Sequence, residues 1–317
     1  MVFCHDCEYL SEKNNLHIDN SFKIAMSDTL IELPDNIARL LISCPDRPGI
    51  VAAVTTFLAN HGANITGLDQ YTSNPTGGTF FMRLEFQTSD LHITGPAIKQ
   101  NFQTAIADPY QMCWRISYAT KLKRITLLVS SQGHCLFELL WRWSRDELPC
   151  QITQVLSNHP IHRELVERFG VPYHYLPITT ETHKEVEHRI MELVGEADLV
   201  VLARYMRILS PAFVQTFQDR VINIHHSFLP AFVGADPYRQ AFERGVKIIG
   251  ATAHYVTKNL DSGPIIEQDV VHISHRHTLA DLKALGRDLE RQVLARAVKM
   301  HLEDRIIRYG NKTVVLR

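Results

Sequence analysis

The sequence lacks the features that mark membrane proteins and nucleic-acid-binding proteins. No apolar run approaches the roughly 18 residues that a membrane-spanning helix needs. The net charge of -1 gives no excess of positive charge for nucleic acid. Neither a Rossmann glycine fingerprint nor an HExxH motif occurs, so neither a nicotinamide cofactor nor a metal is expected. The composition, with 45% hydrophobic residues, is that of an ordinary globular chain.

Cysteine is also sparse, with six residues spread over 317 positions. This spread predicts reduced and mostly buried thiols, because a disulfide framework is typical of short secreted chains. Cys4 and Cys7 have CxxC spacing, but no second pair follows at zinc-finger distance. The sequence therefore predicts no metal site.

Residues 1–35 form a polar N-terminal extension. Its acidic residues fit neither a secretory nor a mitochondrial signal, which favours a cytoplasmic protein. Met26 resembles a second translation start, and we expect residues 1–25 to be dispensable.

Residues 36–118 predict a βαββαβ domain. An apolar strand over Ile37–Ile42 is followed by a turn that ends at Gly49. A helix follows with an apolar face, and Gly62 stops it. Further elements are expected at Asn64–Tyr71, Thr79–Phe86, Pro96–Ile106 (a weaker helix) and Gln111–Tyr118.

The second domain, over residues 122–317, alternates strands and helices, and the basic patch Lys121–Arg124 is the expected boundary. Ile125–Ser130 and Leu199–Ala203 are nearly continuous apolar runs, typical of parallel strands covered on both faces. Thr278 and Asp281 form a capping-box pattern before a long helix. We expect an α/β fold with a mostly parallel sheet. Other helices are expected at Cys135–Trp143, Arg163–Phe169, Glu181–Val194 and Pro211–Phe217.

Two polar residues end an apolar strand in the stretch VINIHHSFLP. Asn223 and His225 are two residues apart, so both side chains leave the same face of the strand. The amide of Asn223 can donate to an oxyanion, and the imidazole of His225 can exchange a proton near neutral pH. His226 should point the other way on a regular strand. The alternative interpretation is two polar groups that only satisfy a strand end.

A second stretch, from Gly250 to Ile266, contains one carboxylate in a short polar loop. Asp261 could orient a water or hold an imidazolium. Its alternative role is that of a solvated turn residue before serine and glycine.

NIHHSFLP followed by HYVTKNLDSGPII resembles the motifs of the folate-dependent formyltransferase family. The resemblance covers roughly residues 122–317 and implies that Asn223, His225 and Asp261 are catalytic. It also implies a formyltransferase-type sandwich. The segment Met206, Arg207, Ile208 and Leu209, together with His254, is similar to the part of the family that holds the folate.

Within this family the chain is most similar to the hydrolytic branch, whose members have an N-terminal ACT domain. HHSFLPAF, PYRQAFERGVKIIGATAHYVT and YGNKTVVL carry this likeness. It implies hydrolysis of 10-formyltetrahydrofolate to formate and tetrahydrofolate, which supplies purine synthesis and one-carbon metabolism. Asp236 departs from the pattern, in which a neutral or basic residue is expected. No cofactor is expected besides the folate substrate.

The sequence of the loop Ser130–Leu136 distinguishes a hydrolase from a formyltransferase. The purine-pathway relative binds a phosphorylated acceptor with a Gly/Ser/Asn-rich loop at this place. Here the loop has a single glycine and can offer fewer backbone N–H groups to an anion. The acceptor is therefore expected to be water. A formyltransferase acting on an unidentified amine and a non-catalytic folate or amino-acid sensor remain as alternatives.

The ACT resemblance of residues 36–118 implies an amino-acid effector, glycine or methionine, and a homo-oligomer of two or more copies. Free N–H groups at the helix start beside Asp46 and Gly49 could take a carboxylate. Asn64 could hold the amine. The alternative is that Gly49 only makes a tight turn and Asn64 only starts a strand.

Overall fold

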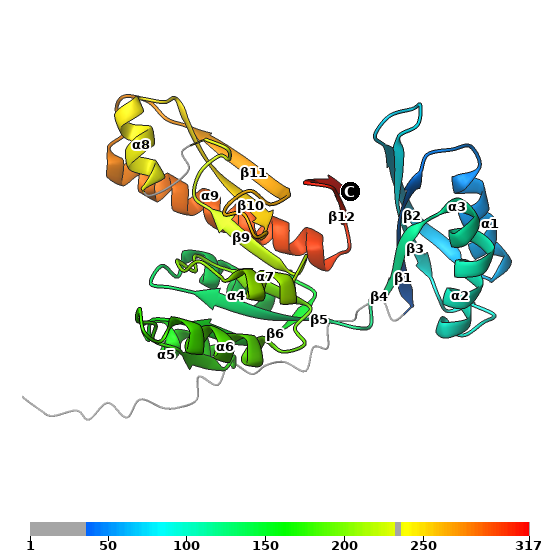
Figure 1. Cartoon of the computed structure of the whole chain (residues 1–317), viewed down its shortest axis with the longest axis horizontal. Helices are drawn as coiled ribbons and strands as arrows, with labels where there is room; N and C mark the ends of the chain where they lie inside the picture. The colour runs from blue at the N-terminus through cyan, green and yellow to red at the C-terminus, as the bar shows by residue number, and fades with distance from the viewer. Residues whose placement is uncertain (1–35, 232–235, 317) are drawn as a thin grey trace, which may run out of the picture. The chain divides into compact units, whose positions relative to one another are not determined.

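The computed structural model describes residues 36–231 and 236–316, and each part is shown in Figure 1. The N-terminal extension, with Cys4, Cys7 and Met26, lies outside the described residues. No helix in the described ranges is long and apolar enough to cross a membrane. Of the cysteines described, Cys44, Cys135 and Cys150 are buried free thiols, as predicted, whereas Cys113 is exposed.

The domain over residues 36–118 contains a four-stranded antiparallel sheet in the order β2-β3-β1-β4. Its helices lie against one face of that sheet (Figure 1). Leu40, Met82 and Leu84 of the sheet form a core with Val54 and Phe102 of the helices. The elements are β1 (Ile37–Pro45), α1 (Ile50–Asn60), β2 (Asn64–Thr72), β3 (Thr79–Gln87), α2 (Gly95–Phe102), a π-helical turn (Gln103–Ala107), α3 (Asp108–Tyr110) and β4 (Cys113–Tyr118).

Boundaries in this domain differ from the predicted ones, most clearly at β1 and β4. β1 continues to Pro45, because its pairing with β3 runs on to Pro45 and Thr79. Pairing of β1 with β4 ends at Ser43, so Pro45 has a sheet neighbour on one side only and its missing N–H costs no ladder bond there. β4 begins at Cys113 and not at Gln111, which has a left-handed backbone with φ of 53°.

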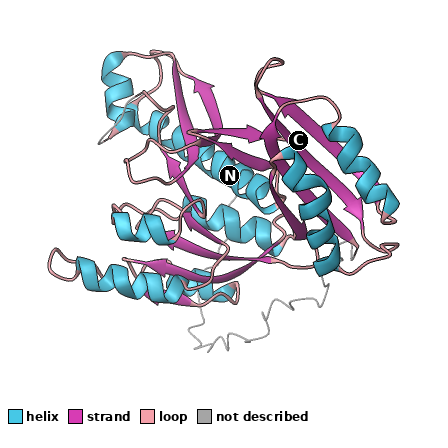
Figure 2. Cartoon of the chain, turned by 45° about the vertical axis from the view of Figure 1, so that its right-hand side comes forward, coloured by secondary structure: helices cyan, strands magenta, loops and turns pink. Residues whose placement is uncertain are grey.

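The second domain has a seven-stranded sheet in the order β11-β10-β9-β8-β5-β6-β7. The strands β9, β8, β5, β6 and β7 are parallel, and only β10 runs antiparallel to its neighbours β9 and β11 among the described strands of this sheet, which confirms the mostly parallel sheet. Figure 2 shows the helices against this sheet. The strands are β5 (Lys123–Val129), β6 (Cys150–Ser157), β7 (Tyr173–Tyr175), β8 (Leu199–Leu202), β9 (Val221–His225), β10 (Ile248–Tyr255) and β11 (Ile265–His272). A two-stranded hairpin follows, formed by β12 (Ile306–Tyr309) and β13 (Lys312–Val315).

The helices of this domain follow local sequence signals. Ser210 caps α7 through its side chain, and Thr278 and Asp281 form the predicted capping box of α9. α9 packs along β9, β10 and β11 through an apolar stripe that includes Leu289, Val293 and Ala297. The helices are α4 (His134–Ser144), α5 (Arg163–Arg168), α6 (His183–Val194), α7 (Pro211–Thr216), α8 (Pro237–Arg244) and α9 (Leu279–Leu302).

The order of strands around β5 indicates where on the sheet a ligand site is expected. The chain moves from β5 to β6 on one side, and later returns to β8 on the other side. Loops that leave the carboxyl ends of β5 and β8 therefore diverge at this point, where open α/β sheets bind ligands. β9, which carries Asn223 and His225, lies directly beside β8.

Candidate active site

Asn223, His225 and Asp261 line one cavity of about 310 Å³, together with His254 and the segment Met206–Leu209. The structure thus brings together every residue predicted for catalysis and folate binding. A neighbouring cavity of about 600 Å³ is larger, but of these residues it shares only Asp261. The smaller cavity is the candidate site, because it contains the groups that can transfer a proton and stabilise an oxyanion.

Asp261 connects two histidines. Its Oδ2 lies 3.3 Å from Nδ1 of His225, and its Oδ1 lies 3.6 Å from Nε2 of His254. Hydrogen bonding to His225, and then to His254, holds the pKa of the Asp261 carboxyl well below its usual value, although burial opposes this. The carboxylate is therefore ionised throughout the neutral range and can hold an imidazolium.

The opposite nitrogen of His225 remains available. Nε2 is buried and has no hydrogen-bond partner among the described residues. Since Nδ1 faces Asp261, Nε2 is the atom that can exchange a proton with a bound molecule. A buried polar atom without a partner is costly in a folded protein, and such atoms are common at functional sites.

His254 contacts Asn223 as well. The two residues are register partners in the antiparallel pairing of β9 with β10. Nδ1 of His254 lies 3.0 Å from the carbonyl oxygen of Tyr255, so this nitrogen carries the proton in the neutral ring. Nδ2 of Asn223 lies 3.3 Å from Nε2 of His254, the nitrogen that faces Asp261. That amide has a second N–H, which can donate into the cavity.

His226 differs from its predicted orientation. We expected its side chain to point away from that of His225, yet both line the same cavity and their ring centroids are 5.2 Å apart. The reason is that β9 ends at His225, so the alternation of a strand does not extend to the next residue. Burial, with the nearby charge of Arg204, lowers the pKa of His226 to about 4.

The segment predicted to hold the folate is fixed at its start and open along its length. The backbone N–H of Met206 donates to Oγ of Ser130 at 2.9 Å, and that hydroxyl donates to Asn158 at 2.8 Å. This joins the loop after β8 to the loop after β5. Met206 and Ile208 are 56% and 70% exposed, so they leave an open apolar surface beside the catalytic groups.

Two residues beside the site, Tyr238 and Glu290, and the ion pair of Arg204 with Glu290 were not predicted from the sequence. Arg204 lines the cavity and is ion-paired at 3.3 Å with Glu290, which accepts a hydrogen bond from the Tyr238 hydroxyl at 2.6 Å. Their partners lie far away in the sequence, so spacing could not reveal them. The available signal was an acidic residue on the buried face of a long helix.

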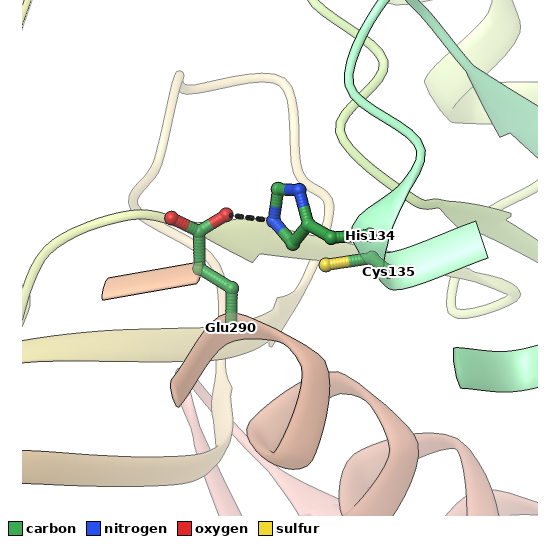
Figure 3. Close-up of side chains that lie close together, drawn as sticks. All are labelled: His134, Cys135 and Glu290. Carbon is green, nitrogen blue, oxygen red and sulfur yellow. Dashed lines mark hydrogen bonds and ion pairs between the residues drawn. The ribbon is translucent and has the colours of Figure 1, made fainter. Parts of the chain in front are cut away.

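His134, Cys135 and Glu290 lie close enough to suggest a metal site, and Figure 3 shows them. His134 Nε2 lies 2.8 Å from Glu290 Oε2, which also pairs with the Arg204 guanidinium. Burial, followed by the charge of Glu290, raises the pKa of the Cys135 thiol well above its usual value. A neutral thiol and a carboxylate already bound to a cation are poor ligands, so this set does not fit a metal ion.

The effector residues predicted in the ACT domain have other partners. Asp46 accepts a hydrogen bond from the Thr72 hydroxyl at 2.8 Å. Gly49 begins α1 with φ of 92°, a left-handed conformation that suits glycine. Asn64 donates to Gln87 on β3 at 3.0 Å.

Asp236 precedes α8 and pairs with Arg239 at 3.1 Å on the surface.

Comparison with known proteins agrees with this architecture. The formyl transferase family matches residues 123–298, and the ACT domain family matches residues 38–103. The chain is 52% identical to the formyltetrahydrofolate deformylase of Bacillus subtilis (strain 168), over 87% of this chain and 93% of the relative.

Solved structures give the same result. A formyltetrahydrofolate deformylase from Pseudomonas syringae pv. tomato matches with a TM-score of 0.86 and 48% identity, over 89% of this chain and 95% of that one. Glycinamide ribonucleotide transformylase 1 from Symbiobacterium toebii matches with a TM-score of 0.58 and 30% identity, over 62% of this chain and 95% of that one. The chain therefore belongs to the formyltetrahydrofolate deformylase family, whose members are hydrolases that act on a C–N bond.

Proposed function

We propose that this protein hydrolyses 10-formyltetrahydrofolate to formate and tetrahydrofolate. The observation that carries the proposal is the set formed by Asn223, His225 and Asp261 in one cavity, beside an open apolar segment. The relatives named formyltetrahydrofolate deformylase support the same reaction.

In the proposed mechanism the pterin ring lies along Met206–Leu209 and the formyl oxygen faces the free N–H of Asn223. Asp261 and His225 position a water, and Nε2 of His225 takes a proton from that water as its oxygen attacks the formyl carbon. Asn223 then stabilises the oxyanion of the tetrahedral intermediate. As the C–N10 bond breaks, Nε2 of His225 delivers a proton to N10, and formate and tetrahydrofolate leave.

The N-terminal domain is the proposed site for an amino-acid effector. The match to the ACT domain family supports an amino-acid effector, for which glycine and methionine are the candidates, and assembly into a homo-oligomer. Release of formate and free tetrahydrofolate would supply purine synthesis and one-carbon metabolism. A shift in melting temperature or rate with millimolar glycine or methionine tests the effector, and no shift in either would remove it.

The decisive experiment contains no amine that could accept the formyl group. The purified protein is incubated with 10-formyltetrahydrofolate alone, and formate and tetrahydrofolate are measured. Equal amounts of both products support hydrolysis. Formyl transfer that requires an added amine would indicate a transferase, and binding without any product would indicate a sensor.

A further inference from the structure

Glu290 joins four elements of the catalytic domain beneath the active site. It is 1% exposed on α9 and receives His134 from α4, Arg204 from the loop after β8, and Tyr238 from α8. Figure 3 shows the side chains of Glu290 and His134 pointing toward each other. We refer to these four residues as the Glu290 cluster.

The carboxylate of Glu290 is held in the cluster by hydrogen bonds and an ion pair. Burial alone would raise the pKa of Glu290, but the hydrogen bond from His134 and the charge of Arg204 outweigh it and lower the pKa. The carboxylate is thus charged and held by three partners, and removing any of them would leave a buried charge less well satisfied. Room for Tyr238 is built into α9, because a Cβ at Gly286 would lie 2.1 Å from the tyrosine hydroxyl.

The Glu290 cluster reaches the active-site cavity through Arg204. Arg204 lines the cavity and is 6% exposed, and its left-handed backbone, with φ of 64°, turns the chain there. His226 also lines it, and the ring of Tyr238 lies 5.9 Å from the His226 ring, behind it. On the other side Met206 and Ile208 are open to solvent. A folate can therefore enter over Met206 and Ile208, whereas the side at Arg204 and His226 is filled.

The volume of the cavity limits the size of a molecule that can bind beside the folate. About 310 Å³ is at the lower end of the range for small-molecule sites, so one bound head group fills most of it. A water molecule needs only about 30 Å³. An amine acceptor of several heavy atoms would need additional space next to His225, where His226 lies 5.2 Å away ring to ring with Tyr238 packed against it, and Arg204 lines the same cavity.

We propose that the Glu290 cluster determines the specificity of the reaction for water, because it closes the cavity to amine acceptors. This inference rests on the proposed hydrolysis. If the wall were opened, the nitrogen of a primary amine would attack the formyl carbon in place of water. The C–N10 bond would break, N10 would take the proton lost by the amine, and a formamide and tetrahydrofolate would form.

The test measures how the formyl group is divided between water and glycinamide, a primary amine of five heavy atoms. The full chain is incubated with 10-formyltetrahydrofolate and glycinamide, and N-formylglycinamide and formate are quantified by mass spectrometry. Wild type should form formate only. Tyr238→Ala should raise the ratio of N-formylglycinamide to formate at least about tenfold over wild type, the scale of discrimination that one pocket wall supplies.

Matched variants distinguish an opened side of the cavity from a general loss of packing. Tyr238→Phe keeps the ring and should keep the wild-type ratio. Tyr173→Ala removes a tyrosine that is equally buried and hydrogen-bonded to the carbonyl of His159, but on β7 and away from the cavity, and should not raise the ratio either. His134→Ala provides a second opening if Tyr238→Ala does not fold, since its side chain is 13% exposed at the edge of the cluster.

Two results would overturn the proposal. One is a folded Tyr238→Ala or His134→Ala protein that releases formate and forms no N-formylglycinamide above wild type. The other is an equal rise in the ratio for Tyr173→Ala. Absence of formate from the wild type would instead reject the proposed hydrolysis, so the two failures can be distinguished.

Discussion

Nδ1 of His225 lies 3.3 Å from Oδ2 of Asp261, and this pairing leaves Nε2 of the same ring for the reacting molecule. The carboxylate fixes the ring orientation and stabilises the imidazolium when His225 holds a proton. Its position depends on a left-handed backbone at Asp261, with φ of 50°, in a loop between two strands.

Asp261→Asn tests this relationship. The amide keeps the volume but loses the charge that holds His225, so kcat should fall by about 10²–10⁴-fold while the fold is retained. Asp269→Asn is the matched control, because Asp269 lies on β11 outside the cavity and pairs with Arg296. The kcat of this variant should stay near that of the wild type. A kcat for Asp261→Asn within threefold of wild type would contradict the proposed role.

Asn223→Ala removes the proposed oxyanion donor. One such donor typically contributes about 10²–10³-fold to turnover, and we expect a loss of that size in kcat. The variant should retain the circular dichroism spectrum of the wild type. Asn101→Ala, on the exposed surface of α2, provides the control and should leave turnover unchanged. Near-normal turnover of Asn223→Ala would remove this residue from the mechanism.

Ser130→Ala should affect substrate binding more than chemistry. The change removes the acceptor for the N–H of Met206 and so loosens the start of the predicted folate segment. A neutral hydrogen bond contributes about 0.5–1.5 kcal/mol, so KM should rise about 2–10-fold with kcat nearly unchanged. Steady-state kinetics check this, with Ser144→Ala as control, since that hydroxyl bonds Trp141 at the exposed end of α4. A fall in kcat at constant KM would show that Ser130 acts otherwise.

His226 predicts a dependence of stability on pH. Its pKa is about 4 in the folded protein against an ordinary value of 6.5. Below pH 6.5 the unfolded chain binds a proton that the folded chain does not, so stability falls as the pH is lowered toward 4. The loss from this residue reaches about 3 kcal/mol at the acid end.

The measurement is urea unfolding at several pH values between 7 and 4.5. His226→Asn should reduce the loss of unfolding free energy on acidification, whereas His188→Asn, at an exposed position of α6, should not. Equal acid sensitivity of wild type and His226→Asn would show that other groups account for it.

Local signals in the sequence were sufficient for most of the fold. The capping box at Thr278 and Asp281 and the N-cap at Ser210 depend on residues within one helical turn, and both are present. The paired positions of Asn223 and His225 follow from strand alternation, and both line the cavity as expected. Signals of this kind survive because they need no knowledge of distant neighbours.

The remaining features depend on tertiary contacts. Whether β9 continues past His225 decides where His226 points, and no local pattern marks that end. His254, expected among the folate contacts, also contacts Asn223 and Asp261, and no local pattern reveals these two contacts. Glu290 and Tyr238 are 52 residues apart, so only the folded chain reveals their hydrogen bond.

The antiparallel pairing of β9 with β10 sets Asn223 opposite His254 and His225 opposite Thr252. Because side chains alternate along a strand, a shift of one residue in either strand would turn these groups to the other face. The site should therefore accept many changes of residue type around it but no change in chain length within β9 or β10. Over evolutionary time, insertions and deletions should accumulate in the surface loops and spare this pair of strands.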